Sequence, residues 1–167
     1  MKRTIRHATP ADIPTLLNLA TEAKKTMRNS GNMKQWGTTY PSAEVFMKDI
    51  ERKASYLVID EDSGQAIATF AFVPGPDPTY ARIYEGQWLD DETPYYVIHR
   101  IAALPTERGI MQTVLDYAFS QTNNIRIDTH RDNLIMRHLM QKHGFAYCGI
   151  IYLANGDERL AFQRRDI

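Results

Sequence analysis

The sequence has little cysteine and no excess of charge of either sign, and both absences narrow its function. Cys148 is the only cysteine among 167 residues, so no internal disulfide can form, which fits a reducing compartment such as the cytoplasm. Lysine plus arginine number 20, as do aspartate plus glutamate, so the formal net charge is zero. A neutral chain without a basic stripe has no general attraction for nucleic acid or for an anionic membrane. We therefore expect neither as a partner.

Long apolar runs and metal-ligand spacings are also missing. No apolar stretch is long enough to span a bilayer, and no signal-like apolar run follows Met1. The histidines show no metal-ligand spacing, so we expect no metal. A chain of 167 residues without repeats can bury a sizeable core, which predicts one domain over residues 1–167.

The most informative stretch runs from Tyr95 to Phe119 and has the pattern of a strand, a sharp turn and a helix. Residues 95–104 are rich in β-branched and aromatic side chains, which is typical of a strand buried on both faces. Pro105 ends this strand, and apolar residues recur at helical spacing from Ile110 onward. The pattern predicts a helix that covers a sheet.

The turn before this helix, Thr106-Glu107-Arg108-Gly109, is a candidate anion site. The first N–H groups of a helix have no partner inside it and lie at the positive end of its dipole. Gly109 would let a diphosphate approach the backbone, and Arg108 would add a charge-assisted contact. Alternatively, the glycine serves only the conformation of the turn.

The remaining elements follow from periodicity and from turn residues. Two successive strand–helix units predict the α/β class, with parallel strands at the centre of the sheet. A helix is expected to begin at Thr9-Pro10-Ala11-Asp12, another after Ser42, and a third after Asp132 or Asn133, ending at Gly144. Further strands are predicted at Lys2–Ala8, 56–59, 66–73, Tyr80–Trp88, 125–129, 145–153 and 158–164.

Two irregular segments allow more than one interpretation. Trp36 and Tyr40 lie in a stretch without a clear period, where they either face a substrate or fill one end of the core. The acidic loop Asp90-Asp91-Glu92 either attracts a cationic amine or is simply solvated.

The chain resembles the GNAT superfamily of acyl-CoA-dependent N-acyltransferases over nearly its whole length. Residues 106–111 occupy the position of the family motif Gln/Arg-x-x-Gly-x-Gly/Ala, with Thr106 and Met111 as departures. Asn133, Leu139 and 142–145 are similar to the second motif, Asn-x(5)-Leu-x-x-x-x-Gly-Phe. The resemblance implies a mixed, mostly antiparallel sheet with parallel central strands and about four helices. It also implies acetyl-CoA as acyl donor, bound by Ile101, Ala102, Ala103, Arg108, Gly109, Ile110, Met111, Gln112 and Asn133.

The resemblance further implies transfer of an acetyl or similar acyl group to an amine of a small molecule or peptide. Many family members use a tyrosine as the acid, and this chain has Met140 at that position. We expect His99 as base and Tyr147 as acid; Cys148 is a less favoured nucleophile, and Glu85 or Asp128 would act through water. The alternative is an inactive module that binds CoA or another small ligand in a regulatory or interaction role. A homodimer is an open option.

Overall fold

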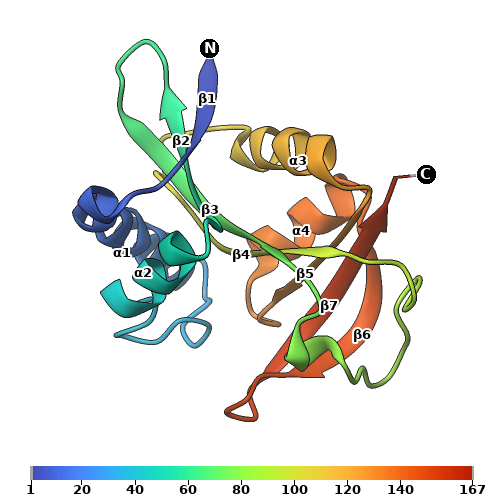
Figure 1. Ribbon diagram of the computed structural model, residues 1–167. Coiled ribbons are helices and arrows are strands. Elements are labelled where there is room, and N and C mark those ends of the chain that lie inside the picture. The colour runs from blue at the N-terminus through green and yellow to red at the C-terminus, as the bar shows by residue number, and fades with distance from the viewer. Residues whose placement is uncertain (1, 167) are drawn as a thin grey trace.

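The computed structural model describes residues 2–166, and its centre is a seven-stranded sheet with the order β1-β2-β3-β4-β5-β7-β6. Figure 1 shows this sheet with helices on both sides. The strands are β1 (Arg3–His7), β2 (Ser55–Asp60), β3 (Ala66–Pro74), β4 (Tyr96–Ala103), β5 (Asn124–Thr129), β6 (Ala146–Tyr152) and β7 (Glu158–Arg165).

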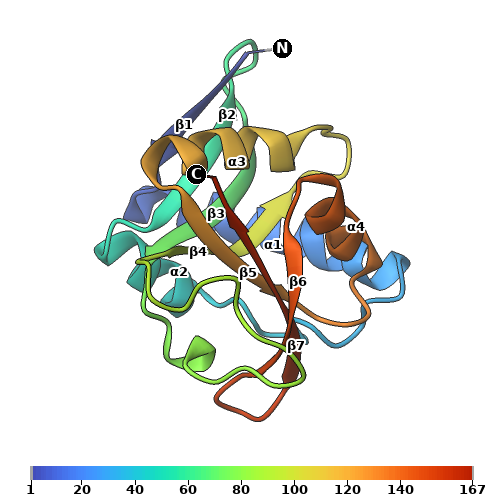
Figure 2. The ribbon, with the colours of Figure 1, turned by 90° about the vertical axis from the view of Figure 1, so that its right-hand side faces the viewer.

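Two pairs of helices cover the two faces of the sheet, as Figures 1 and 2 show. The first pair is α1 (Ile13–Asn29) with α2 (Ala43–Glu51), and the second is α3 (Ile110–Gln121) with α4 (Leu134–Lys142). Each pair buries its apolar stripe in its own cluster, built around Leu16 and Phe46 on one face and around Val114 and Met140 on the other. None of the helices in residues 2–166 is both long and apolar enough to cross a bilayer.

Six strand pairings hold the sheet together, and only the pairing of β4 with β5 is parallel. The expected mixed sheet with parallel central strands and four helices is thus confirmed. The second strand–helix unit differs from a simple parallel series. Its return strand β6 does not lie beside β5, because β7 is inserted between them and pairs antiparallel with both.

The sheet opens at its centre. β4 and β5 pair only through Tyr96 with Ile125 and Val97 with Arg126, and beyond these residues the strands have no further pairing. A bulge on the other edge of β4 places Ala102 opposite Thr69 and His99 opposite Ala71, so β4 carries one extra residue. Arg100, within the bulge, has a φ of 52°, a left-handed conformation that is unusual for a non-glycine residue. The bulge and the parted strands together form a wedge in the sheet.

The predicted strand at Tyr80–Trp88 is wrong. Pro78–Tyr80 form a short 3-10 helix. In the segment that follows, Tyr84 pairs with Ile150 of the sheet through an isolated bridge. Its aromatic residues suggested a strand because Tyr80 and Trp88 are indeed buried, but they pack against the face of β6 and β7 with Cys148, Ile151 and Ala161. A loop that lies flat on a sheet buries the same residue types as a strand within it.

The helix predicted at Thr9 begins slightly later than expected. Pro10–Asp12 form a 3-10 turn, and α1 starts at Ile13. The carboxylate of Asp12 accepts from the Thr9 N–H at 2.8 Å and from Arg6 at 2.8 Å. Hydrogen bonding from Arg6 is the main reason that the pKa of Asp12 is lowered to about 2. Asp12 therefore stabilises the 3-10 turn that leads into α1, whereas the first turn of α1 itself has no acidic residue.

Candidate active site

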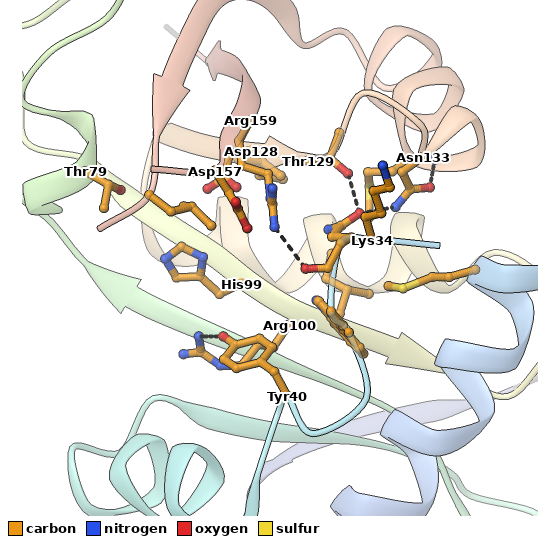
Figure 3. Close-up of a pocket in the computed structure, with 18 of the residues that line it drawn as sticks. Lys34, Tyr40, Thr79, His99, Arg100, Asp128, Thr129, Asn133, Asp157 and Arg159 are labelled. Atoms are coloured by element: carbon orange, nitrogen blue, oxygen red, sulfur yellow. Dashed lines mark hydrogen bonds between the residues drawn. The ribbon is translucent and has the colours of Figure 1, made fainter. Parts of the chain in front are cut away.

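A cavity of about 470 Å³ lies at the wedge between β4 and β5. Figure 3 shows side chains that converge on it from several parts of the chain. These parts are the end of α1 and the α1–α2 connection, the β3–β4 loop, the parted ends of β4 and β5, the start of α4, and the turn between β6 and β7 with the start of β7. A cavity of this volume suits a small molecule or the end of a peptide. Trp36 and Tyr40 both line it, although Trp36 also packs against the core around Leu16.

His99 and Asp77 form a hydrogen-bonded pair in the cavity wall, with His99 Nε2 3.2 Å from Asp77 Oδ2. Burial alone would raise the pKa of the Asp77 carboxyl, but hydrogen bonds from His99 and Thr79 outweigh burial and lower it to about 2. An ionised carboxylate only accepts hydrogen bonds, so Nε2 of a neutral His99 carries the proton and Nδ1 is left with its lone pair. The pair has the geometry of a base held in one tautomer.

The β3–β4 loop that carries Asp77 is anchored to the sheet by Arg126 of β5. The guanidinium of Arg126 lies 4.0 Å from the ring centre of Trp88 and 3.9 Å from that of Tyr95. It also donates to the carbonyl of Asp90 at 2.9 Å and to the carboxylate of Asp91 at 3.1 Å. The acidic loop is therefore more than a solvated surface, since it binds this buried arginine through Asp90 and Asp91.

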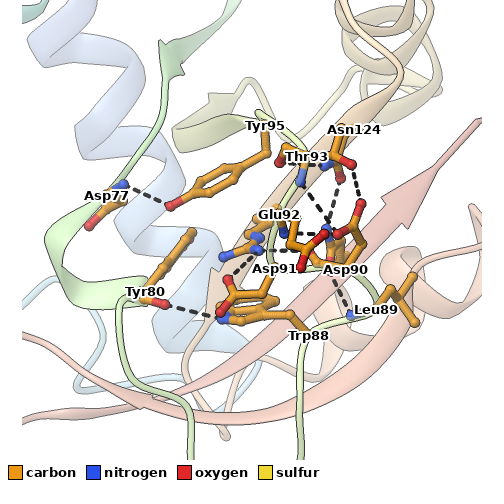
Figure 4. Close-up of polar contacts among 12 residues, drawn as sticks. Asp77, Tyr80, Trp88, Leu89, Asp90, Asp91, Glu92, Thr93, Tyr95 and Asn124 are labelled. Atoms are coloured by element: carbon orange, nitrogen blue, oxygen red, sulfur yellow. Dashed lines mark hydrogen bonds and ion pairs between the residues drawn. The ribbon is translucent and has the colours of Figure 1, made fainter.

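Two further contacts fix the path of this loop. The hydroxyl of Tyr95 accepts from the Asp77 N–H at 2.8 Å, as Figure 4 shows. Gly86 passes so close to β6 that a Cβ there would lie 1.9 Å from the Cys148 carbonyl oxygen. A larger residue at position 86 would lift the loop, and Asp77 with it.

Arg100 forms a second polar cluster at the bulge. Its guanidinium donates through Nε and Nη2 to the two carboxylate oxygens of Asp49, each at 2.8 Å, and through Nη1 to the Tyr40 hydroxyl at 2.9 Å. Asp49 is buried in α2 and also accepts from Arg52 at 2.7 Å. Burial opposes the charge of Arg100, but Tyr40 and Asp49 outweigh it, so the pKa of Arg100 is raised. The cluster connects α2 and the α1–α2 connection to the bulged strand.

The turn before α3 has the features expected of an anion site. Gly109 adopts a φ of 71°, and the first helical bond of α3 runs from the Thr113 N–H to the Gly109 carbonyl at 3.2 Å. The N–H groups of Ile110, Met111 and Gln112 precede that bond and have no acceptor within residues 2–166. An added Cβ on Gly109 would meet only Arg3, at 3.8 Å. The backbone is therefore open to a ligand there.

Arg3 of β1 contacts this turn, and the sequence did not predict that contact. From β1 it donates to the carbonyl of Arg108 at 2.6 Å and to the hydroxyl of Thr113 at 3.1 Å. It places a cation beside the first turn of α3, and Arg108 provides another on an exposed side chain. No local pattern could reveal this contact, because 105 residues separate Arg3 from Arg108.

The other predicted cofactor residues fall into two groups. Ile101 and Asn133 line the cavity, and Asn133 also caps α4, its Oδ1 accepting from the Met136 N–H at 3.0 Å. The side chains of Ala102, Ala103, Ile110 and Met111 do not face the cavity, so these residues are available to a ligand only through the main chain. Ala102, Ile110 and Met111 are buried in the core, Ala103 packs against it, and Gln112 donates to Asp116 on the surface.

The structure does not bring all predicted catalytic residues together. His99 and Asp128 line the cavity, whereas Tyr147 and Glu85 are exposed and do not. Met140 is fully buried in the core. Cys148 is buried as well, and its burial raises the pKa of its thiol, which suits a packing residue better than a nucleophile. Within residues 2–166, no group of three or more potential ligands is arranged to hold a metal ion.

Comparisons with known proteins identify a matching family model and similar structures. The model of the Acetyltransferase (GNAT) family matches residues 16–145. An acetyltransferase of the GNAT family from Streptococcus agalactiae 2603 is similar in structure, with a TM-score of 0.89, 32% identity and coverage of 99% of this chain and 96% of that chain. A GNAT acetyltransferase from Listeria monocytogenes 4b F2365 shares 19% identity, with a TM-score of 0.70 and coverage of 98% and 95%.

A third similar structure is the NatC complex bound to Gag peptide and CoA. Its matching chain shares the fold at 13% identity, with a TM-score of 0.65 and coverage of 100% of both chains. Among curated proteins, none matches this chain.

Proposed function

Because this chain belongs to the GNAT acetyltransferase family, we propose that it moves an acetyl or similar acyl group from acyl-CoA directly to an amine of a small molecule or peptide. The observation that carries the proposal is the wedge between β4 and β5. Its cavity is lined by a histidine paired with a carboxylate, and α3 begins nearby in sequence with unpartnered N–H groups. We place the reaction in the cytoplasm, where a lone buried thiol stays reduced.

The acyl donor is expected to bind through the first turn of α3. The N–H groups of Ile110, Met111 and Gln112 would donate to the diphosphate, with Arg108 and Arg3 adding positive charge nearby. The main chain of β4 at Ile101–Ala103 would polarise the thioester carbonyl, since β5 has parted from this strand. The CoA bound in the NatC complex supports the same class of ligand here.

For this reaction, the residues of the chain must transfer protons and hold the amine in position to attack the thioester. His99 Nδ1 accepts a proton from the ammonium or amine of the acceptor, while Asp77 holds the ring by its Nε2 hydrogen. The amine lone pair forms the new C–N bond as the C–S bond breaks, and the thiolate leaves and takes up a proton. Acyl-CoA supplies the activated acyl group.

We propose Tyr40 as the acid that donates a proton to the leaving thiolate. Its hydroxyl oxygen accepts from Arg100 Nη1 at 2.9 Å, which leaves the hydroxyl hydrogen free to point elsewhere in the cavity. Met140 cannot serve because it carries no proton and is fully buried. We do not carry Tyr147 into the mechanism, since it lies outside the cavity lining.

The experiment that tests the proposal measures thiol release from acetyl-CoA with a panel of amines. We expect His99→Ala to lower kcat by about 10²- to 10⁴-fold, because it removes the positioned base. The rate of the parent enzyme should rise with pH as the acceptor amine loses its proton. Asp77 has a pKa of about 2, so its carboxylate stays ionised near neutral pH and does not change the dependence of the rate on pH.

Asp77→Asn is the matched control for this variant. It keeps the shape of the residue but lets the imidazole adopt the other tautomer, so it should also lower kcat while leaving the KM for acetyl-CoA unchanged. An unchanged kcat in His99→Ala would remove this residue from the mechanism. CoA binding without turnover across the whole panel would favour the alternative, an inactive module, for which Thr106, Met111 and Met140 are the supporting departures.

A further inference from the structure

Arg159 is a buried charged residue of the cavity that the proposed reaction does not use. It lies near the start of β7, lines the cavity and is 4% exposed. Its guanidinium donates to two main-chain carbonyls, those of Glu158 and Gln35, each at 2.9 Å. None of the ion pairs within residues 2–166 includes Arg159. A buried charge is costly unless an opposite charge compensates it, so this position calls for an anion.

The side chain of Gln35 presents a second donor to the same cavity. Asn133 Oδ1 accepts from a main-chain N–H, which fixes the amide of Asn133 and makes its Nδ2 the donor to Gln35 Oε1 at 3.1 Å. Asn32 Nδ2 donates to the same oxygen at 2.9 Å. The amide of Gln35 therefore cannot be reversed. Its Nε2, with two hydrogens, has no partner in the described part of the chain.

The cavity also carries groups suited to a cation. Asp128 Oδ2 accepts from the buried hydroxyl of Tyr80 at 2.6 Å, which leaves its other oxygen for a ligand. Figure 3 shows Asp128 and Asp157 in the same part of the cavity as Arg159, and His99 beside them. Neither aspartate forms an ion pair with Arg159. The cavity of about 470 Å³ is thus lined by both positively and negatively charged side chains.

We propose that the acceptor is a free amino acid or a close analogue, an amine that also carries a carboxylate. Arg159 and Gln35 Nε2 bind the carboxylate, and Asp128 and His99 receive the amine. This inference rests on the proposed function and specifies its substrate class. The N-terminus of a peptide has a neutral amide where a free amino acid has its carboxylate, and a polyamine has a second cation, so neither compensates the charge of Arg159.

The test compares the standard L-amino acids with their amides as acceptors, by thiol release from acetyl-CoA. At least one amino acid should have a kcat/KM on the order of 30-fold or more above that of its amide, because the amide cannot pair with a buried guanidinium. Arg159→Met should bring that amino acid down to the level of its amide while the KM for acetyl-CoA stays the same. A melting curve checks that the variant folds, and replacing an unpaired buried charge with an apolar side chain should cost little stability.

Gln35→Glu is a second variant of matched size. It keeps the oxygen that accepts from Asn133 and Asn32 and puts a carboxylate oxygen where Nε2 was, so it should select against amino acids and leave the fold intact. Equal turnover of amino acids and amides by the parent, or a preference that survives Arg159→Met, would overturn the inference. If no amine at all releases thiol, the proposed function fails instead. Calorimetry of amino acids against amides in the presence of CoA then decides the inference, and equal affinities would overturn it.

Discussion

Gly109→Glu is expected to abolish the binding of CoA. The substitution puts a carboxylate beside the unpartnered N–H groups of Ile110, Met111 and Gln112, where the diphosphate must lie. The carboxylate repels the diphosphate, and the added side chain blocks its approach to the backbone. CoA binding should therefore fall below detection in calorimetry. The side chain itself has room, because an added Cβ would meet only Arg3, at 3.8 Å.

The matched control is Gly109→Gln, which has the same size and no charge. Both variants force a side chain into a left-handed conformation with a φ of 71°, so both should lose about 1 kcal/mol of stability. Only the glutamate variant should lose binding completely. Arg108→Ala should weaken binding by about 1 to 3 kcal/mol, since it removes a charge-assisted contact and keeps the turn. A folded Gly109→Glu protein that binds CoA at the parent's affinity would place the cofactor elsewhere.

Asp49→Ala is expected to have the largest effect on stability. Asp49 receives the hydrogen bonds from Nε and Nη2 of Arg100, and without it this largely buried guanidinium keeps only the Tyr40 hydroxyl. Breaking a buried ion pair by removing one partner costs about 3 to 5 kcal/mol. Urea unfolding of the variant measures this loss. The bulge at Arg100 should loosen as well, and turnover should fall with it.

Two further variants separate the structural role of this pair from its functional role. Arg52→Ala removes the half-exposed partner of Asp49 and should cost no more than about 1 kcal/mol. The double variant Asp49→Leu with Arg100→Met replaces the pair by apolar side chains, which should recover most of the stability. If the pair positions β4 for catalysis, turnover stays low in this stable double variant. A loss of less than 1 kcal/mol in Asp49→Ala would show that the pair does not hold the bulge.

Local patterns in the sequence were enough to predict most of the fold. The spacing of apolar residues identified α1, α3 and α4, and the residues of the turn before α3 identified its open N–H groups. The failure at Tyr80–Trp88 has a physical cause, because burial against the face of a sheet selects the same side chains as pairing within it. Arg126 gave no signal either, since a charge within an apolar strand gains its partners only from the loop that folds over it.

The candidate site was harder to predict because its contacts join distant segments. His99 was identified, but its partner Asp77 lies 22 residues away in a proline-rich loop that local rules describe only as irregular. Gln35 and Asn133 are 98 residues apart, and Gln35 and Arg159 are 124 apart. Periodicity and motif spacing say nothing about such pairs. The residues of the turn before α3 indicated an anion site, and the family resemblance added Asn133, whereas Arg3, Gln35 and Arg159 became candidates only in three dimensions.

A crystal structure of the complex with CoA tests the central claim most directly. The account predicts diphosphate oxygens within hydrogen-bond distance of the N–H groups of Ile110, Met111 and Gln112. It also predicts that the thiol end lies in the wedge between β4 and β5, beside Ile101 and within reach of the cavity that holds His99. CoA bound at any other surface, or a wedge closed by pairing of β4 with β5 along their full length, would contradict it.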